Sequence, residues 1–217
     1  MNDINPFKYI NIDNSSHWII SEIILNQCKN YPERKIIEFV DGPEWSFDDL
    51  KNKSFEKAKI LQDLHVKQGD TVTVMVDEPI EFIPYWAASS FLGVMFVALN
   101  TALQGSVLHH QITLTKSNVM IVSDVYYENV IQLVKEKNLK IKVFNCSSLT
   151  YNGMIQEKDV YIGKISDEVC AMFTSGTSGP SKGVLMPNAH CVLFAVGTIE
   201  NYKLNHNHVF YISLPLF

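Results

Sequence analysis

Thr71-Val72-Thr73-Val74-Met75-Val76 is the stretch that decides the fold. It is short, rich in β-branched residues and preceded by the turn pair Gly69-Asp70, which is typical of a buried strand. A helix is expected from about Ile80, followed by a second strand near residues 94–99. A buried strand, a helix and another buried strand form the repeating unit of a parallel sheet, so this stretch predicts an α/β protein.

The same alternation continues on both sides of this stretch. Upstream, Ser15 or Ser16 can cap a helix that ends at Tyr31-Pro32, and Ser46 with Asp49 resembles a capping box. We therefore expect a mostly parallel β-sheet flanked by helices. The expected downstream elements are helices over residues 107–116, 126–137 and 188–202, and strands over 119–122, 141–144, 169–173, 184–186 and 209–214.

Composition and charge exclude several classes of protein. Of the 217 residues, 47% are hydrophobic and 19% are charged, which is enough apolar content for a packed core and too little charge for a disordered chain. The net charge is −5 and the isoelectric point about 5.8. No general basic surface is therefore expected for nucleic acid, and an anionic ligand must be bound locally.

Neither a membrane span nor a secreted protein is expected. Residues 82–99 carry no charge, but Pro84 and Gly93 interrupt them, so a buried helix that runs into a buried strand fits better than a transmembrane segment. The N-terminus lacks the apolar stretch of a secretory signal. The four cysteines are in no C-x-x-C pair, and a reduced cytoplasm is the expected compartment.

The segment Thr174-Ser175-Gly176-Thr177-Ser178-Gly179-Pro180-Ser181-Lys182-Gly183 directly follows the expected strand 169–173. Ligands of open α/β sheets bind just past the carboxyl ends of strands. The glycines allow the backbone to approach a ligand closely, successive N–H groups can form an anion-binding nest, and the lysine adds a positive charge. The segment is a candidate phosphate loop.

Two other interpretations of this loop were weighed. A flexible Ser/Gly linker would have a similar composition. A Walker A loop needs Gly-x-x-x-x-Gly-Lys-Ser/Thr, but Ser181 stands at the second glycine position and Gly183 follows Lys182. A P-loop NTPase is therefore disfavoured. Outside the loop, His109 and His110 are expected to point in different directions from a helix and to lie at the surface.

The loop resembles the phosphate-loop motif of the acyl-adenylate-forming superfamily, which includes AMP-forming acyl-CoA synthetases, luciferases and peptide-synthetase adenylation domains. Its pattern is Ser/Thr-Ser-Gly-Ser/Thr-Ser/Thr-Gly-x-Pro-Lys-Gly. Ser181 replaces the usual proline, and Pro180 comes one position earlier. Other segments resemble family elements in the family's order: residues 45–50, 69–72, 91–94, 98–101 and 213–217.

The resemblance implies an activity and a set of ligands. Family members use ATP and Mg²⁺ to convert a carboxylic acid to an acyl-adenylate, and coenzyme A then displaces AMP. Fatty, aryl and carnitine-like acids all remain open as substrates. By similarity, the phosphates would be bound by Thr174, Ser175, Gly176, Thr177, Ser178, Gly179 and Lys182. The catalytic residues and metal ligands of the family would lie beyond Phe217, so none is expected within this chain.

The resemblance also implies that the chain is an incomplete N-terminal domain of the adenylate-forming fold. Residues 1–166 are expected to form an α/β subdomain, and residues 167–217 the phosphate loop and the start of the next subdomain, with the C-terminal domain absent. Exposed apolar surface is expected where the sheet is incomplete. The alternatives are a non-catalytic remnant, a nucleotide- or pyrophosphate-binding module, or half of a split enzyme. A separate C-terminal half or a second copy would then be its partner.

Overall fold

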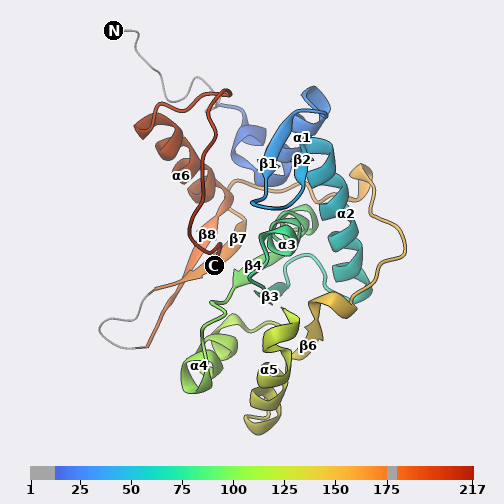
Figure 1. Ribbon diagram of the computed structural model, residues 1–217, viewed down its shortest axis with the longest axis vertical. Coiled ribbons are helices and arrows are strands. Elements are labelled where there is room, and N and C mark those ends of the chain that lie inside the picture. Colours follow the sequence, from blue (N-terminus) through green and yellow to red (C-terminus); the bar gives the residue numbers. More distant parts are fainter. Residues whose placement is uncertain (1–12, 175–179) are drawn as a thin grey trace.

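The computed structural model describes residues 13–174 and 180–217. Within them, a six-stranded sheet has the strand order β6-β5-β3-β4-β7-β8 (Figure 1). All neighbouring pairs from β6 to β7 are parallel, and β8 is antiparallel to β7. The expected mostly parallel sheet is therefore confirmed. The strands of this sheet are β3 (Thr71–Met75), β4 (Met95–Ala98), β5 (Val119–Val122), β6 (Lys142–Asn145), β7 (Glu168–Phe173) and β8 (Gly183–Pro187).

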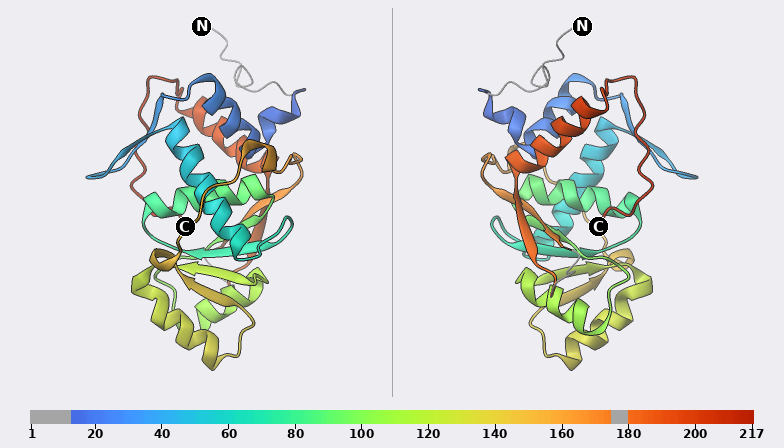
Figure 2. Two further views of the ribbon diagram at one scale, coloured as in Figure 1. Left: turned by 90° about the vertical axis from the view of Figure 1, so that its right-hand side faces the viewer. Right: turned by 90° about the vertical axis from the view of Figure 1, so that its left-hand side faces the viewer.

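Helices cover both faces of the sheet (Figure 2). One face packs on α1, α2, α3 and α6, and these helices form the larger core with Val72 and Val74 of β3. The other face packs on α4 and α5, which form a smaller core with Met75 and Met120. Burial on both faces explains why β5 is a continuous apolar run rather than an alternating one. The helices are α1 (Ile20–Asn30), α2 (Phe47–Asp63), α3 (Pro79–Leu92), α4 (Gly105–Thr115), α5 (Asp124–Glu136) and α6 (Asn188–Asn201).

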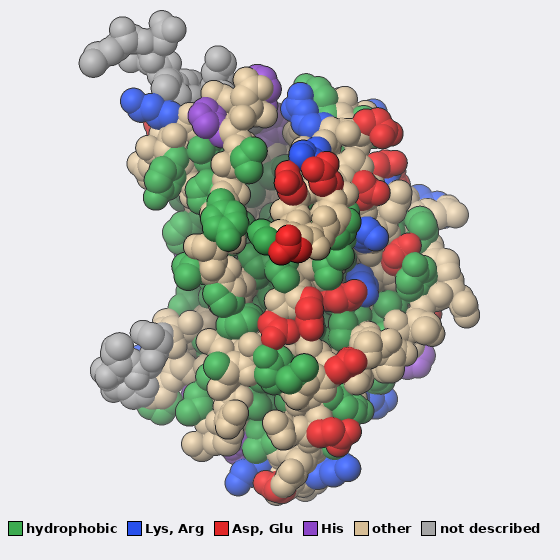
Figure 3. All heavy atoms as spheres, in the orientation of Figure 1, with side chains coloured by type: hydrophobic (Ala, Val, Ile, Leu, Met, Phe, Trp, Pro, Cys, Tyr) green, Lys and Arg blue, Asp and Glu red, His purple; other side chains and the backbone are tan. Residues whose placement is uncertain are grey.

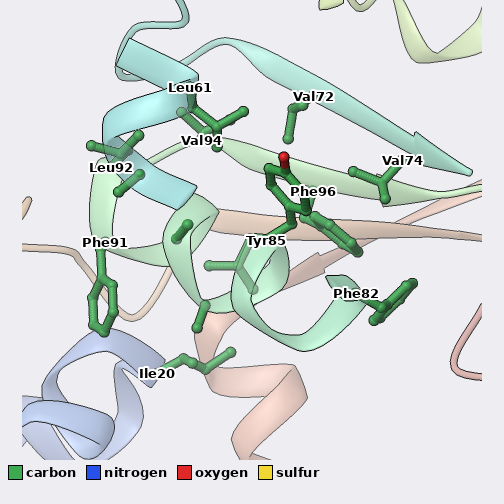
Figure 4. Packing of buried hydrophobic residues seen from close by; sticks show 14 of the residues in the cluster. Ile20, Leu61, Val72, Val74, Phe82, Tyr85, Phe91, Leu92, Val94 and Phe96 are labelled. Atoms are coloured by element: carbon green, nitrogen blue, oxygen red, sulfur yellow. The ribbon is translucent and has the colours of Figure 1, made fainter. Parts of the chain in front are cut away.

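Aromatic side chains of α3 fill the centre of the larger core (Figure 4). Tyr85 and Phe91 are fully buried. The ring of Phe91 meets Phe55 of α2 edge to face at 5.2 Å, and Phe82 meets Phe96 of β4 in the same way at 5.2 Å. Burying one such ring contributes about 1.5–3 kcal/mol, so α3 is a principal source of the stability of this face.

The uncharged stretch over residues 82–99 forms a helix followed by a strand, as expected. Pro79 stands in the first turn of α3, and Pro84 lies within the helix without ending it. Gly93 ends the helix in the left-handed conformation, with φ 63°. None of the helices in the described part of the chain is long and apolar enough to cross a membrane.

Local capping signals were predicted with mixed success. The capping box of α2 is confirmed: Asp49 N–H donates to Ser46 Oγ (3.1 Å), and Ser46 N–H donates to Asp49 Oδ2 (2.9 Å). The predicted cap at Ser15 or Ser16 is wrong. Asn14 caps a short 3-10 helix over Ser15–Trp18, and α1 begins only at Ile20, because the chain turns between the two. The expected end of α1 at Tyr31 is confirmed.

Two segments differ from the sequence prediction. The hairpin of β1 (Lys35–Glu38) and β2 (Glu44–Ser46) was not expected. The strand expected over residues 209–214 does not form, and Val209 is 91% exposed. A strand needs hydrogen-bond partners on a neighbouring strand, and among the described residues nothing pairs with this segment, although its composition favours a strand.

Candidate functional site

The candidate phosphate loop connects β7 to β8 at the carboxyl edge of the sheet. Phe173 pairs with Gly183, the last and first residues of the two strands. Just beyond this pair, Thr174 N–H donates to the Lys182 carbonyl oxygen (3.0 Å), and Lys182 N–H donates to Thr174 Oγ1 (3.2 Å). Because β7 is parallel to β4, the loop leaves the sheet at the edge where ligands of α/β proteins bind.

The structure describes part of the predicted site. Thr174 and Lys182 lie opposite each other at the neck of the loop, and both are exposed. Lys182 forms no ion pair with any residue that the structure describes. An exposed lysine without an internal partner can provide its charge to an anionic ligand. The other predicted site residues, Ser175, Gly176, Thr177, Ser178 and Gly179, lie outside the described residues.

Helix α4 holds the other end of the loop at Ser181. The amide Nε2 of the buried Gln111 donates to Ser181 Oγ (3.0 Å). His110 Nε2 lies 3.0 Å from the Ser181 carbonyl oxygen. A carbonyl oxygen can only accept, so Nε2 of His110 must carry the proton in this contact. These two contacts fix the residue directly before Lys182.

His110 was expected at the surface, but it is half-buried and contacts the loop. The contacts with Ser181 also give a physical reason why this residue can replace the proline of the family pattern. The hydroxyl of Ser181 receives a hydrogen bond that proline could not accept, and a ring is no longer needed to restrain this position. No sequence signal identified the contact, because His110 and Gln111 are 71 and 70 residues away from Ser181.

A second polar cluster lies at the same edge of the sheet, where β3 and β5 end. Ser123 Oγ donates to Glu78 Oε2 (2.7 Å), and Tyr126 OH donates to Asp77 Oδ2 (2.8 Å). Burial of Asp77 opposes its charged form, but the hydrogen bonds from Tyr126 and its other neighbours outweigh burial and lower its pKa. The two carboxylates of this cluster, Asp77 and Glu78, both follow β3 and disfavour polyphosphate there, which leaves the β7 end as the better anion site.

The described residues contain no group of three His, Cys, Asp or Glu side chains that could hold a metal ion. The polar side chains at the described neck of the loop are the hydroxyl of Thr174 and the ammonium of Lys182, and both can donate to phosphate oxygens.

Comparisons with known proteins bear on the fold and the family of the chain. A 2-succinylbenzoate–CoA ligase from Oceanobacillus iheyensis is 28% identical over 207 residues, which are 94% of this chain and 40% of the ligase. The o-succinylbenzoate coenzyme A synthetase from Bacillus subtilis, solved in complex with AMP, has the same fold, with a TM-score of 0.79, 23% identity, and coverage of 89% of this chain and 49% of that chain. The same enzyme, in complex with ATP and magnesium ion, gives a TM-score of 0.78 at 22% identity over 89% of this chain and 50% of that one.

The chain therefore spans about 40% of the length of the ligase that it matches. The fold corresponds to the N-terminal part of the adenylate-forming fold, as expected from the sequence. The family model that describes AMP-binding enzymes matches residues 24–217, which is most of the chain. This protein belongs to the family of AMP-binding enzymes.

Proposed function

We propose that this chain is the phosphate-binding portion of an ATP-dependent, AMP-forming acid–CoA ligase. The observation that carries the proposal is the neck of the β7–β8 loop, where Thr174 and Lys182 face each other at the carboxyl edge of the sheet. Ten residues that resemble the family's phosphate-loop motif occupy this position. The relatives named above are CoA ligases, and one was solved with ATP and magnesium ion.

The chemistry of such a ligase explains why the loop is needed. A carboxylate must attack an α-phosphate that is itself negative, so the site must neutralise charge on both reactants and on the leaving pyrophosphate. We assign the β- and γ-phosphates to Ser175, Gly176, Thr177, Ser178 and Gly179, together with Thr174 and Lys182 at the neck. In this role, the Lys182 ammonium and the Thr174 hydroxyl bind and orient the leaving group, and neither acts as a nucleophile.

Magnesium would reduce the negative charge of the phosphates. The hydroxyl and ammonium groups at the loop would contact the phosphates and not the Mg²⁺ ion, because they are hydrogen-bond donors. Coenzyme A and the carboxylic acid would be bound mainly by parts of the ligase that this chain does not supply. An aromatic acid such as 2-succinylbenzoate is the first substrate to test, because a matched relative is named as a ligase of that acid.

We further propose that the remaining part of the ligase covers an apolar face formed by β8, α6 and the segment after α6. Figure 3 shows hydrophobic side chains on the side of the molecule where α6 and this segment lie. β8 is the edge strand of the described sheet. The exposed apolar residues of these elements are Val184, Leu185, Leu193, Phe194, Tyr202, Val209, Phe210, Tyr211, Ile212 and Leu214.

Exposed apolar area on this scale is unusual for an isolated domain and marks a contact surface. In a ligase of the length of its relatives, the residues that follow position 217 would extend the sheet beside β8 and pack on α6. The same face would bind a separately encoded C-terminal half in a split enzyme, whereas a second copy of this chain would cover it in a homo-oligomer. Mixing the chain with a downstream half and measuring the mass of the complex distinguishes these cases.

Pyrophosphate binding by the purified chain tests the function of the loop directly. We expect Lys182→Ala to weaken binding about tenfold or more, because a charge-assisted hydrogen bond contributes about 1.5–3 kcal/mol. Lys140→Ala is the matched control: Lys140 is also exposed, but it precedes β6 at the opposite edge of the sheet. Equal binding by the two variants would contradict the assignment of the loop.

ATP–pyrophosphate exchange tests the activity separately. It is measured with Mg²⁺ and a panel of carboxylic acids, for the chain alone and for the chain mixed with a downstream half taken from a relative. We expect acid-dependent exchange in the mixture and its loss in Lys182→Ala. Exchange by the chain alone would show that the complete adenylation site lies within these 217 residues and would overturn the division of labour proposed here.

A further inference from the structure

Cys170 and Cys191 face each other between β7 and α6, with their sulfur atoms 3.8 Å apart. Cys170 lies within β7, and Cys191 is the fourth residue of α6. Both side chains pack against the larger core, but both are also partly exposed. The two residues are therefore reduced thiols in contact with each other. Both are accessible to a small reagent from the solvent.

The distance between the two sulfurs is short enough for a covalent bond with little movement. A disulfide needs an S–S distance of about 2.05 Å, so the sulfurs must approach by roughly 1.8 Å, which side-chain rotation and small shifts of α6 can supply. The other cysteines lack such a partner: Cys28 Sγ donates to the Phe47 carbonyl oxygen (3.2 Å), and Cys146 Sγ donates to Glu81 Oε2 (3.5 Å). Both of these thiols are buried.

The two thiols of the pair differ in acidity. The hydrogen bond from Cys170 lowers the pKa of Cys191, although burial opposes this effect. The same hydrogen bond, with burial, raises the pKa of Cys170. Cys191 also lies near the N-terminus of α6, a position that favours a thiolate. By contrast, burial raises the pKa of Cys146 to about 12.

We propose that Cys170 and Cys191 are an oxidation site, at which hydrogen peroxide or an organic peroxide forms a reversible intramolecular disulfide. The Cys191 thiolate attacks a peroxide oxygen, the O–O bond breaks, and Cys191 becomes a sulfenic acid with release of water (or an alcohol) after protonation. Cys170 then attacks the Cys191 sulfur and displaces hydroxide, which takes the Cys170 proton and leaves as water. Two thiols are oxidised and one peroxide is reduced.

The disulfide would join the strand before the phosphate loop to the helix after it. Cys170 lies three residues before the end of β7 at Phe173, where the loop begins, and β8 leads from Gly183, where the loop ends, to the start of α6 at Asn188. Oxidation therefore ties together the elements that hold both ends of the loop. The geometry of the pair, and not the identity of the nucleotide, carries this inference, so it does not depend on the proposed ligase activity.

The test treats the purified, reduced chain with hydrogen peroxide under native conditions and maps its peptides by mass spectrometry without reduction. We expect a cross-linked peptide pair that contains Cys170 and Cys191, and its disappearance after dithiothreitol. The peptides of Cys28 and Cys146 serve as internal controls and should remain reduced. A missing cross-link, a link to either control cysteine, or a link between two chains overturns the proposal.

Two variants test the order of the steps. In Cys170→Ser, the sulfenic acid on Cys191 has no resolving thiol, so dimedone should label Cys191. In Cys191→Ser, dimedone should not label Cys170 on the same timescale. Equal labelling in both variants would overturn the assignment of Cys191 as the attacking thiol. If either variant fails to fold, dimedone competition with disulfide formation in the unsubstituted chain identifies the same residue.

Discussion

Gly93 is the position where a single added methyl group should be most damaging. It ends α3 with φ 63°, a conformation that costs a residue with a Cβ about 1–2 kcal/mol. A Cβ there would also lie 2.5 Å from Cδ1 and 2.8 Å from Cγ of Tyr161. The ring cannot move away freely, because Tyr161 N–H donates to the Phe91 carbonyl oxygen (2.8 Å) and its OH donates to Asp167 Oδ2 (3.0 Å).

We expect Gly93→Ala to lower the free energy of unfolding by about 2–5 kcal/mol, since overpacking adds about 1–3 kcal/mol to the backbone strain. Gly105→Ala is the matched control: Gly105 has φ 54°, and a Cβ there meets no atom within 4 Å. It should lose only the strain component, about 1–2 kcal/mol. Urea denaturation of both variants measures the difference.

Removing the ring should relieve the steric part of the loss. Tyr161→Ala opens the space that the added methyl group needs, so the double variant Gly93→Ala/Tyr161→Ala should be more stable than the sum of the single losses predicts. The coupling should match the overpacking component, about 1–3 kcal/mol. Additive losses, or equal losses in Gly93→Ala and Gly105→Ala, would refute the steric argument.

Three further outcomes follow from the contacts described. Ser46→Ala should lower the free energy of unfolding by about 1 kcal/mol in urea, because it removes the side-chain half of the capping box. Hydrogen bonds from the Ser46 backbone and hydroxyl lower the pKa of Asp49 below its ordinary 3.8. The stabilisation from the hydroxyl-to-carboxylate bond is complete above that pH and is lost as the pH falls through the folded-state pKa, whereas the Asp49 N–H bond to Ser46 Oγ does not titrate. The gap between Ser46→Ala and the parent chain should therefore narrow in acid without closing, and a constant gap would contradict this account. Ser181→Ala should lower the free energy of unfolding by about 1–3 kcal/mol, because it leaves the buried Gln111 amide without its acceptor, and it should also weaken pyrophosphate binding. In a double-mutant cycle, adding Gln111→Ala to Ser181→Ala should cause little further loss of stability. The oxidised cysteine pair, which spans 21 residues, should raise the free energy of unfolding by about 3 kcal/mol relative to the reduced chain, as measured in urea with and without dithiothreitol.

The elements that the sequence predicted well are those whose signals are local or strongly buried. β5 was predicted to the residue, since Val119–Val122 is an uninterrupted apolar run on a strand that is buried on both faces. The capping box of α2 was predicted because its two partners are three residues apart. The strand at 184–186 was predicted, but its antiparallel direction was not, although the loop after β7 is too short for a parallel crossover.

The missed elements depend on partners that lie elsewhere. β1 and β2 are each too short to show a strand pattern, and they form because they pair with each other. The segment 209–214 has the composition of a strand but pairs with nothing that the structure describes. In both cases the decisive information is a neighbouring backbone, which periodicity within one segment does not contain.

The candidate site divides in the same way. The motif located the loop and its lysine, because these residues are consecutive in the chain. The support from His110 and Gln111 comes from another helix and was not predicted. The assignment of phosphate contacts to Thr174, Lys182 and residues 175–179, and the subdomain boundary between residues 166 and 167, stay predictions.

The distribution of burial links the stability of the fold to the strength of the site. Val72 and Val74 of β3 are fully buried between helices, whereas Val184 and Leu185 of β8 are 42% and 49% exposed. The loop is attached to this less buried side of the sheet, and α4 contacts its neck at Ser181. Local opening is easiest where buried apolar contacts are fewest. The conformational entropy lost when a binding segment becomes ordered weakens the affinity for a ligand. Covering the apolar face of β8 and α6 should therefore tighten phosphate binding without adding any contact to the phosphate itself.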